Sequence, residues 1–178
     1  MSTRSKQIIA IILLLALGLW LVFTFGPFGD EVPPRRKPHN TNKTPVIEPR
    51  FQKEGHLAIL DTSASDTLVL LDIEIAEAPD EIQYGMMYRR KINPKTGMLF
   101  LMGRERPLSF YMKNTYVPLD IIYINDEQKI VSIAKNATPL DETSLPSKKP
   151  ASLVLEVKGG FSDSLSLREG QKIIWERL

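Results

Sequence analysis

The chain begins with one long apolar run that differs from everything after it. Residues 8–25 are almost entirely apolar, and no charged residue occurs between residues 7 and 29. A helix needs about 20 such residues to cross the hydrocarbon core of a bilayer. The pattern therefore predicts a transmembrane anchor over residues 7–26, preceded by a short N-terminus of residues 1–6.

Charges beside this run predict its orientation. Arg4 and Lys6 precede it, and because basic residues favour the cytoplasmic side, we expect residues 1–6 in the cytoplasm and the following domain on the extracytoplasmic side. Basic residues at 35–37 weaken this signal without reversing it. A cleaved signal peptide is the alternative, but its apolar region is normally about 7–15 residues long. The run here is longer and lacks a small-x-small exit site, so a retained anchor is favoured.

A proline-rich segment follows the apolar run. Residues 27–50 hold six prolines among polar and charged residues, without apolar periodicity. Such a segment is semi-extended, at about 3.1 Å per residue where it is polyproline-like. We interpret it as a tether that leads to a globular domain of residues 51–178. A segment of that length is the usual size of one domain with its own core.

Short apolar segments bounded by polar turns fill the region after the tether, and polarity alternates most clearly at residues 67–77 and 151–157. Polar turns at 103–107 and 126–128 each separate two such segments, which predicts two hairpins, and residues 138–150 are typical of an exposed loop. Eight segments in all fit strands, and they are 55–61, 67–77, 98–102, 108–112, 119–125, 129–134, 151–157 and 171–175.

Two further segments favour helical structure. Pro79 stands at a plausible first helical position, acidic residues follow it, and Arg89 and Arg90 suit the negative end of a short helix. Residues 161–168 fit a helical turn. The fold class predicted is therefore α+β and mostly antiparallel β, a compact barrel or sandwich of about eight strands with one or two short helices, preceded by one transmembrane helix.

Composition narrows the classes of function. The chain has 23 basic and 21 acidic residues, whereas residues 51–178 hold 16 basic and 18 acidic ones, so the domain is slightly acidic and we expect no nucleic-acid partner. The absence of cysteine excludes disulfides, thiolate metal sites and cysteine nucleophiles. No Gly-x-Ser-x-Gly, His-Glu-x-x-His or phosphate-binding glycine loop occurs, which disfavours hydrolytic triads and the common metal and nucleotide sites.

Five ordered sequence blocks resemble a known family. The chain is similar, over about residues 57–175, to the domain of unknown function family numbered 192. That resemblance implies a compact, mostly β domain, frequently found behind an export signal or membrane anchor, and it implies no reaction, catalytic residue or cofactor. Met86 stands where the family usually has leucine, and Tyr111 where it usually has tryptophan. The blocks are Gly85-Met-Met-Tyr-Arg89, Gly97-Met-Leu-Phe100, Phe110-Tyr-Met-Lys-Asn-Thr115, Pro118-Leu-Asp-Ile121 and Leu155-Glu-Val157.

Polar residues within these blocks are the candidate ligand-binding set. A cation, an amide, a hydroxyl and two carboxylates could orient a small polar ligand or exchange a proton with it. The alternative is a hydrogen-bonded turn in which Asp120 pairs with Arg89 or Lys113. The candidate residues are Arg89, Lys113, Asn114, Thr115, Asp120 and Glu156.

Methionines form a second cluster in the same region. Thioethers bind monovalent copper, but methionine more often fills irregular cores, so copper binding is a minor alternative and we expect no resident metal or cofactor. The clustered residues are Met86, Met87, Met98, Met102 and Met112.

These observations predict a membrane-tethered, extracytoplasmic binding or interaction module for an unknown envelope ligand or protein. The alternative is an envelope hydrolase, or another enzyme acting on carbohydrate or peptide. In that case Asp120 or Glu156 would serve as acid or base, and Arg89 or Lys113 would orient the substrate.

Overall fold

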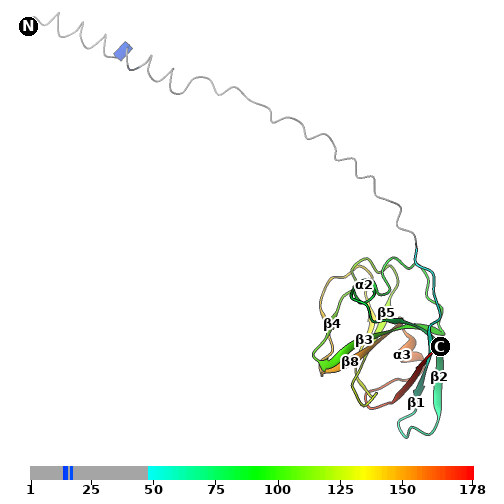
Figure 1. Cartoon of the computed structure of the whole chain (residues 1–178). Helices are drawn as coiled ribbons and strands as arrows, with labels where there is room; N and C mark the ends of the chain where they lie inside the picture. Colours follow the sequence, from blue (N-terminus) through cyan, green and yellow to red (C-terminus); the bar gives the residue numbers. More distant parts are fainter. Residues whose placement is uncertain (1–13, 16, 18–47) are drawn as a thin grey trace, which may run out of the picture. The chain divides into compact units, whose positions relative to one another are not determined.

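The computed structural model describes residues 14, 15, 17 and 48–178 (Figure 1). The predicted cytoplasmic N-terminus, anchor and tether therefore lie outside the described residues, apart from three helical leucines and residues 48–50. Among the described residues, no helix has the length and apolar character needed to cross a membrane.

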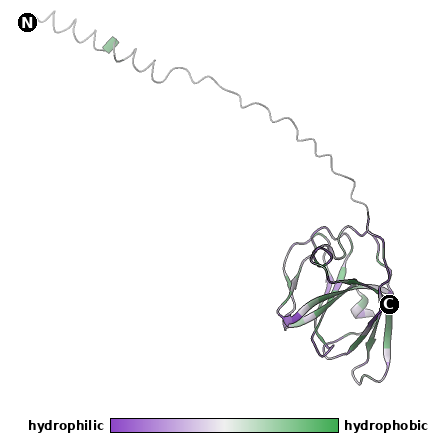
Figure 2. Cartoon of the chain, in the orientation of Figure 1, coloured by the Kyte–Doolittle hydropathy of each residue, from purple (hydrophilic) through white to green (hydrophobic). Residues whose placement is uncertain are grey.

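Residues 48–178 are mostly β-structure with two short helices, as predicted. Many residues of the strands are hydrophobic, and the end of β3 is hydrophilic (Figure 2). In chain order the elements are β1 Gly55–Leu60, β2 Thr67–Ala76, α2 Pro79–Tyr84, β3 Thr96–Arg106, β4 Ser109–Phe110, β5 Leu119–Ile124, β6 Ile130–Ala137, β7 Leu145–Pro146, β8 Ala151–Lys158, α3 Phe161–Ser164 and β9 Ile173–Arg177.

Seven strands form one sheet in the order β6-β5-β8-β3-β2-β1-β9. Its pairs are antiparallel except β2 with β3, which run parallel and are joined by a crossover that contains α2. Backbone hydrogen bonds link Ile130, at the start of β6, to Gly170 and Gln171, which precede β9. The two edge strands nevertheless do not pair as a ladder, so the sheet is not closed into a barrel.

The first predicted hairpin, 98–102 with 108–112, is wrong. β3 continues through Arg106, where it still pairs with β8, so the chain does not turn back at residues 103–107. Residues Ser109–Phe110 pair instead with Leu145–Pro146, inside the segment predicted to be an exposed loop. The second predicted hairpin, formed by β5 and β6, is confirmed.

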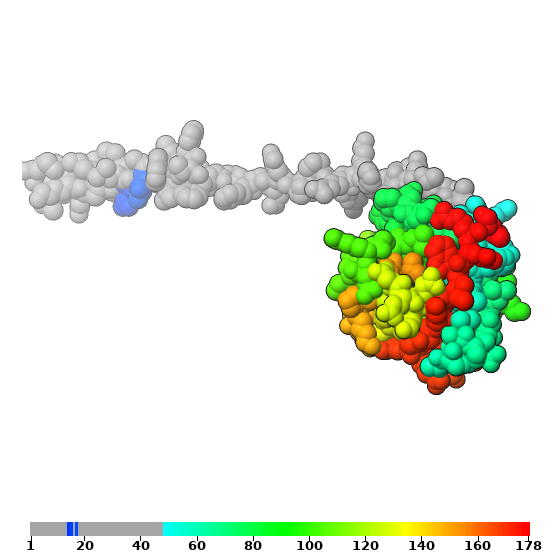
Figure 3. Space-filling model, turned by 60° about the horizontal axis from the view of Figure 1, so that its bottom comes forward, coloured from blue at the N-terminus to red at the C-terminus, as the bar shows by residue number. Residues whose placement is uncertain are grey.

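The large sheet is buried on both faces. Alternate residues point to opposite faces of a strand, so Leu99 and Leu155 belong to one core cluster while Phe100 and Val154 belong to the other. The first cluster includes Phe161 of α3, and the second packs against α2 and the β4–β7 pair. Strand β9 borders β1, and Figure 3 shows the C-terminal residues in red against the cyan and teal surface near the start of the domain.

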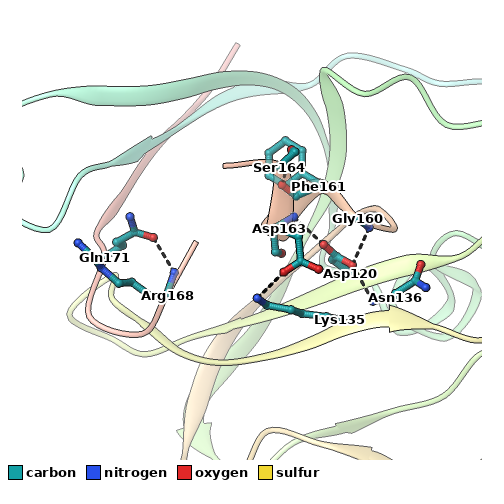
Figure 4. A network of polar contacts seen from close by, with 10 residues as sticks. Asp120, Lys135, Asn136, Gly160, Phe161, Asp163, Ser164, Arg168 and Gln171 are labelled. Carbon is teal, nitrogen blue, oxygen red and sulfur yellow. Dashed lines mark hydrogen bonds and ion pairs between the residues drawn. The ribbon is translucent and has the colours of Figure 1, made fainter. Parts of the chain in front are cut away.

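Asp120 holds the end of β6 and the beginning of α3 against β5. Its side chain is fully buried, and its carboxylate accepts hydrogen bonds from the backbone N–H groups of Asn136 at 2.7 Å, Gly160 at 3.1 Å and Ser162 at 2.6 Å (Figure 4). Neither Arg89 nor Lys113 is its partner in the described part of the chain. The carboxylate satisfies donors that the turn and the short helix leave open.

Replacing this carboxylate should loosen the domain. We expect Asp120→Asn to lower the free energy of unfolding by about 2–3 kcal/mol, because an amide cannot accept all these N–H donors as a carboxylate does. Urea denaturation measures the effect. Asp163→Asn is the matched control, since that carboxylate is exposed and pairs with Lys135, and should cost less than about 0.5 kcal/mol. Equal unfolding midpoints for both variants would contradict the structural role.

Candidate functional site

A cavity of about 200 Å³ lies between the α2 crossover, β3 and the residues around β4. Its walls are largely apolar, with few polar groups, which is the usual composition of a small-molecule site. Tyr84 and Tyr111 are 57% and 44% exposed, so the lining reaches solvent at these two rings. The apolar part of the lining includes Tyr84, Met86, Met87, Phe100, Met102, Phe110 and Tyr111, and the polar part includes Gln83, Ser109, Thr115 and Glu156.

Strand pairing places Glu156 inside this cavity. Glu156 on β8 lies opposite Met98 on β3, and Met98 lies opposite Glu74 on β2. Paired residues point to the same face of a sheet. Two carboxylates therefore flank Met98 on the face that the α2 crossover covers.

Glu156 has no hydrogen-bond partner for one of its oxygens. The residue is 5% exposed, and its Oε2 atom is buried without a partner among the described residues. Burial raises the pKa of the Glu156 carboxyl to about 7, although a hydrogen bond from the Met86 amide and the charge of Arg89 act to lower it. A carboxyl with such a pKa changes protonation near neutral pH.

Glu74 neutralises Arg89 in an adjacent ion pair. Arg89 Nη1 lies 2.6 Å from Glu74 Oε2, and Nη2 donates to Oε1 at 2.9 Å. The Gln52 amide donates to the same Oε1 at 3.0 Å. Both side chains are buried, and two contacts join them. The pair therefore fixes the segment after α2 to the sheet.

Gly85 forms the wall between this ion pair and Glu156. The predicted helix that ends in Arg89 and Arg90 is too long, because α2 ends at Tyr84 and Gly85 adopts a positive φ of +46°. A Cβ atom on Gly85 would lie 2.8 Å from Phe100 Cζ and 3.4 Å from Glu156 Oε2. Only glycine lets the backbone pass this close to the cavity without displacing the ring.

Tyr88 and Asn114 connect two of the sequence blocks that resemble the family, residues 85–89 and 110–115. The Tyr88 amide donates to the Asn114 carbonyl at 2.8 Å, and Asn114 Nδ2 donates to Tyr88 Oη at 2.9 Å. Both residues have positive φ, at 66° and 54°, a conformation that costs energy for residues other than glycine. The reciprocal bonds stabilise this backbone and hold Thr115 in the cavity wall.

The candidate set is divided among three places. Thr115 and Glu156 line the cavity. Arg89 and Asn114 do not line it but hold in place the segments that form its walls, and Lys113 is exposed. Asp120 lies opposite Val157, and Ile121 lies opposite Glu156, so Asp120 points to the other face of the sheet. Asp120 and Glu156 therefore do not face a common substrate.

Sequence reasoning missed Glu74 and the aromatic walls. Glu74 is an acidic residue at a buried position of an apolar strand, a pattern that indicates a buried partner. Phe110 and Tyr111 stand within a block that resembles the family, and the sequence predicts only a strand there. Their place beside α2 depends on the β4–β7 pairing.

The methionine cluster is also divided. Met86, Met87 and Met102 line the cavity, whereas Met98 and Met112 are buried in the core and do not line it. Within the described residues, no group of three or more His, Cys, Asp or Glu side chains could hold a metal ion. Copper binding stays a prediction.

The buried carboxyl should make stability depend on pH. Its pKa is 4.5 in an unfolded chain and about 7 when folded, so the folded state binds more protons between these values and stability falls as pH rises through them. The full loss is about 3 kcal/mol. We expect the stability of Glu156→Gln relative to the wild type to rise by about this amount between pH 4.5 and pH 8, measured by urea denaturation. Glu142→Gln, which alters an exposed carboxyl, should follow the wild type, and parallel profiles for both variants would contradict the assignment.

Three comparisons with known proteins were informative to different degrees. No functionally curated protein matches the chain. A crystal structure of a "putative transcription regulator" from Sinorhizobium meliloti 1021 is similar to it, with 33% identity, a TM-score of 0.66, and coverage of 71% of this chain and 98% of that one. A protein of unknown function from Novosphingobium aromaticivorans DSM 12444 shows 34% identity, a TM-score of 0.63, and coverage of 67% and 84%.

The family model of the domain of unknown function family 192, described as an uncharacterized ACR, matches residues 60–175. That range is well over half of the chain and includes every residue named above as lining the cavity. The chain therefore belongs to the domain of unknown function family 192.

Proposed function

We propose that the domain is a binding module that takes a small, mostly apolar ligand into the cavity and fixes one polar group of that ligand with Glu156. The observation that carries this proposal is the buried Oε2 atom of Glu156, which has no protein partner among the described residues and lines the cavity. A buried polar atom without a hydrogen bond costs about 1–3 kcal/mol. A ligand that supplies the missing donor recovers that energy.

The dimensions of the cavity limit the ligand. An apolar cavity of about 150 Å³ is large enough to hold benzene, and the volume here is about 200 Å³. The ligand is therefore a single ring or a short chain with one hydrogen-bond donor. Four aromatic side chains and three thioethers supply its apolar contacts.

The sequence supports a membrane-tethered location for this module, with its ligand in the cell envelope. The apolar run of residues 8–25 and the basic residues before it carry this part of the proposal.

Location can be tested with the full chain. We expect it to stay with membranes after an alkaline carbonate wash, to keep its N-terminus by intact mass, and to be digested by protease added on the extracytoplasmic side. Leu14→Arg combined with Leu17→Arg should release it, because charges in the bilayer core are costly. Release of the wild type, or loss of its first residues, would contradict a retained anchor and favour a cleaved signal peptide.

A second candidate is an envelope enzyme that uses Glu156 as its acid or base. The pKa of about 7 favours it, because a carboxyl with that pKa can exchange protons at neutral pH. Glu156 is the one carboxyl that lines the cavity in the described part of the chain. A two-carboxylate mechanism with Asp120 is excluded by the opposite faces of the two side chains. Binding is therefore the better-supported function.

The tyrosine at the rim should contribute to binding but not to folding. We expect Tyr111→Ala to weaken binding of small single-ring compounds about fivefold, since aromatic contacts are worth about 0.5–1.5 kcal/mol. Ligand-observed saturation-transfer NMR with toluene, benzyl alcohol and benzylamine measures this effect. Tyr116→Ala is the matched control, because Tyr116 is similarly exposed but contacts Tyr88 and Arg90 outside the cavity lining. Equal weakening by both variants, or no binding of any compound, would contradict the proposal.

A further inference from the structure

We propose that the ligand of this cavity is a small organic monocation, an ammonium ion carried on a single ring or short apolar chain, which pairs with Glu156 and displaces its proton. This inference rests on the proposed function and names the chemical class of the ligand. It follows from the balance of charge around the cavity, from the composition of its walls and from the groups beside its rim.

The buried charges near the cavity lack one positive partner. Arg89 is bound through both terminal nitrogens to Glu74, so this ion pair is neutral as a unit. Glu156 has no such partner, and within residues 48–178 no lysine, arginine or histidine lines the cavity. Ionised Glu156 therefore leaves the cluster with one uncompensated negative charge. A ligand cation would supply the missing charge, whereas an anion would add a second one.

The walls suit a cation as well as they suit an apolar group. Aromatic faces attract ammonium ions through the negative charge of the ring quadrupole, and thioethers are polarisable. The rings come from both sides of the cavity, with Tyr84 on the α2 side and Phe100, Phe110 and Tyr111 on the side of β3 and β4. Phe100 and Phe110 pack edge to face, with ring centroids 5.1 Å apart.

A second, larger cavity beside the first also favours a positively charged ligand. It has a volume of about 610 Å³ and shares Tyr84, Gly85 and Met87 with the first, so the two cavities are adjacent. Its charged lining residues are all acidic, and they are Glu54, Glu74, Asp80 and Glu81. Because Arg89 neutralises only one of these carboxylates, the surface beside the rim is negative and raises the local concentration of cations.

Proton displacement follows from the position of Glu156. The charged and titratable groups that act on it are Arg89 from the crossover and Tyr123 from β5, and Glu74 of β2 lies on the same face beyond Met98. The Arg89–Glu74 pair is internally compensated, and burial raises the pKa of Tyr123, so its hydroxyl stays neutral and donates to the Leu145 carbonyl. Glu156 is then the group that changes protonation when a cation enters near neutral pH.

Two other occupants would leave different signatures. A neutral alcohol would donate a hydrogen bond to ionised Glu156 or accept one from its protonated form. Its affinity would then show no preference for high pH. Monovalent copper, held by Met86, Met87 and Met102, would compete with the organic ligand and would bind in the absence of any ammonium group.

Isothermal titration of the full chain in zwitterionic lipid nanodiscs tests the inference, with empty nanodiscs as the blank. The probes are benzylamine, benzyl alcohol and benzoate, which share one ring and differ in charge. We expect benzylamine to bind at least about tenfold more tightly than benzyl alcohol at pH 8, and benzoate not to bind. The affinity for benzylamine should fall by about tenfold per pH unit below about pH 7 and level off above it.

Variants and buffers identify the group that responds. Glu156→Gln should remove both the preference for benzylamine over benzyl alcohol and its pH dependence, because an amide carries no charge to pair with an ammonium ion, and Glu142→Gln should behave as the wild type. Proton release from the wild-type chain is measured independently, by comparing the binding enthalpy in buffers that differ in ionisation enthalpy, so the test stands even if a variant folds poorly.

The possible failures are distinct. Equal affinity for benzylamine and benzyl alcohol, or benzylamine binding at pH 6 without proton release, overturns the cation inference and leaves the binding function standing. Absence of binding by all three probes overturns both. Competition by monovalent copper together with no effect of Glu156→Gln assigns the cavity to the metal and also overturns the inference.

Discussion

The ion pair between Arg89 and Glu74 connects an irregular segment to a regular sheet, and the cavity exists because of that connection. The segment after α2 has little secondary structure of its own, and a glycine at positive φ begins it. The guanidinium is buried and bound at both terminal nitrogens, so removing either partner would leave an uncompensated charge, a change that costs about 3–5 kcal/mol in buried pairs. The pair therefore keeps Gly85 and Met86 in place above Glu156.

The same geometry explains why two neighbouring glutamates behave differently. Glu74 and Glu156 lie on one face of the sheet, on either side of Met98. Glu74 receives the guanidinium and a backbone amide, whereas Glu156 keeps one oxygen without a partner among the described residues. The difference in partners, and not in burial, separates a structural carboxylate from one that is available to a ligand.

The strands themselves could be predicted from local pattern, but several of their partners could not. Short apolar segments bounded by polar turns located β1, β2, β5, β6 and β8, and the polar loop at 126–128 identified the β5–β6 hairpin. The pairing of β3 with β2 and β8 joins residues distant in sequence, so no local pattern indicates it. The hydrophilic end of β3 resembles a turn because its last four residues are Gly-Arg-Glu-Arg.

The same limit applies to the site. Thr115 and Glu156 were named from sequence, but Asp120 could be assigned to the opposite face only once the register of β5 with β8 was known. The tyrosines at the rim carry no local signal of their role.

The pairing of β1 with β9 has a consequence for the order of folding. Gly55 lies opposite Arg177, and the amide of Leu178 donates to the carbonyl of Glu54 at 2.9 Å, so the first strand of the domain pairs with its last strand. During synthesis, one edge of β1 therefore stays unpaired until β9 has been made. A fragment that lacks residues 173–177 would expose that edge to pairing with another chain.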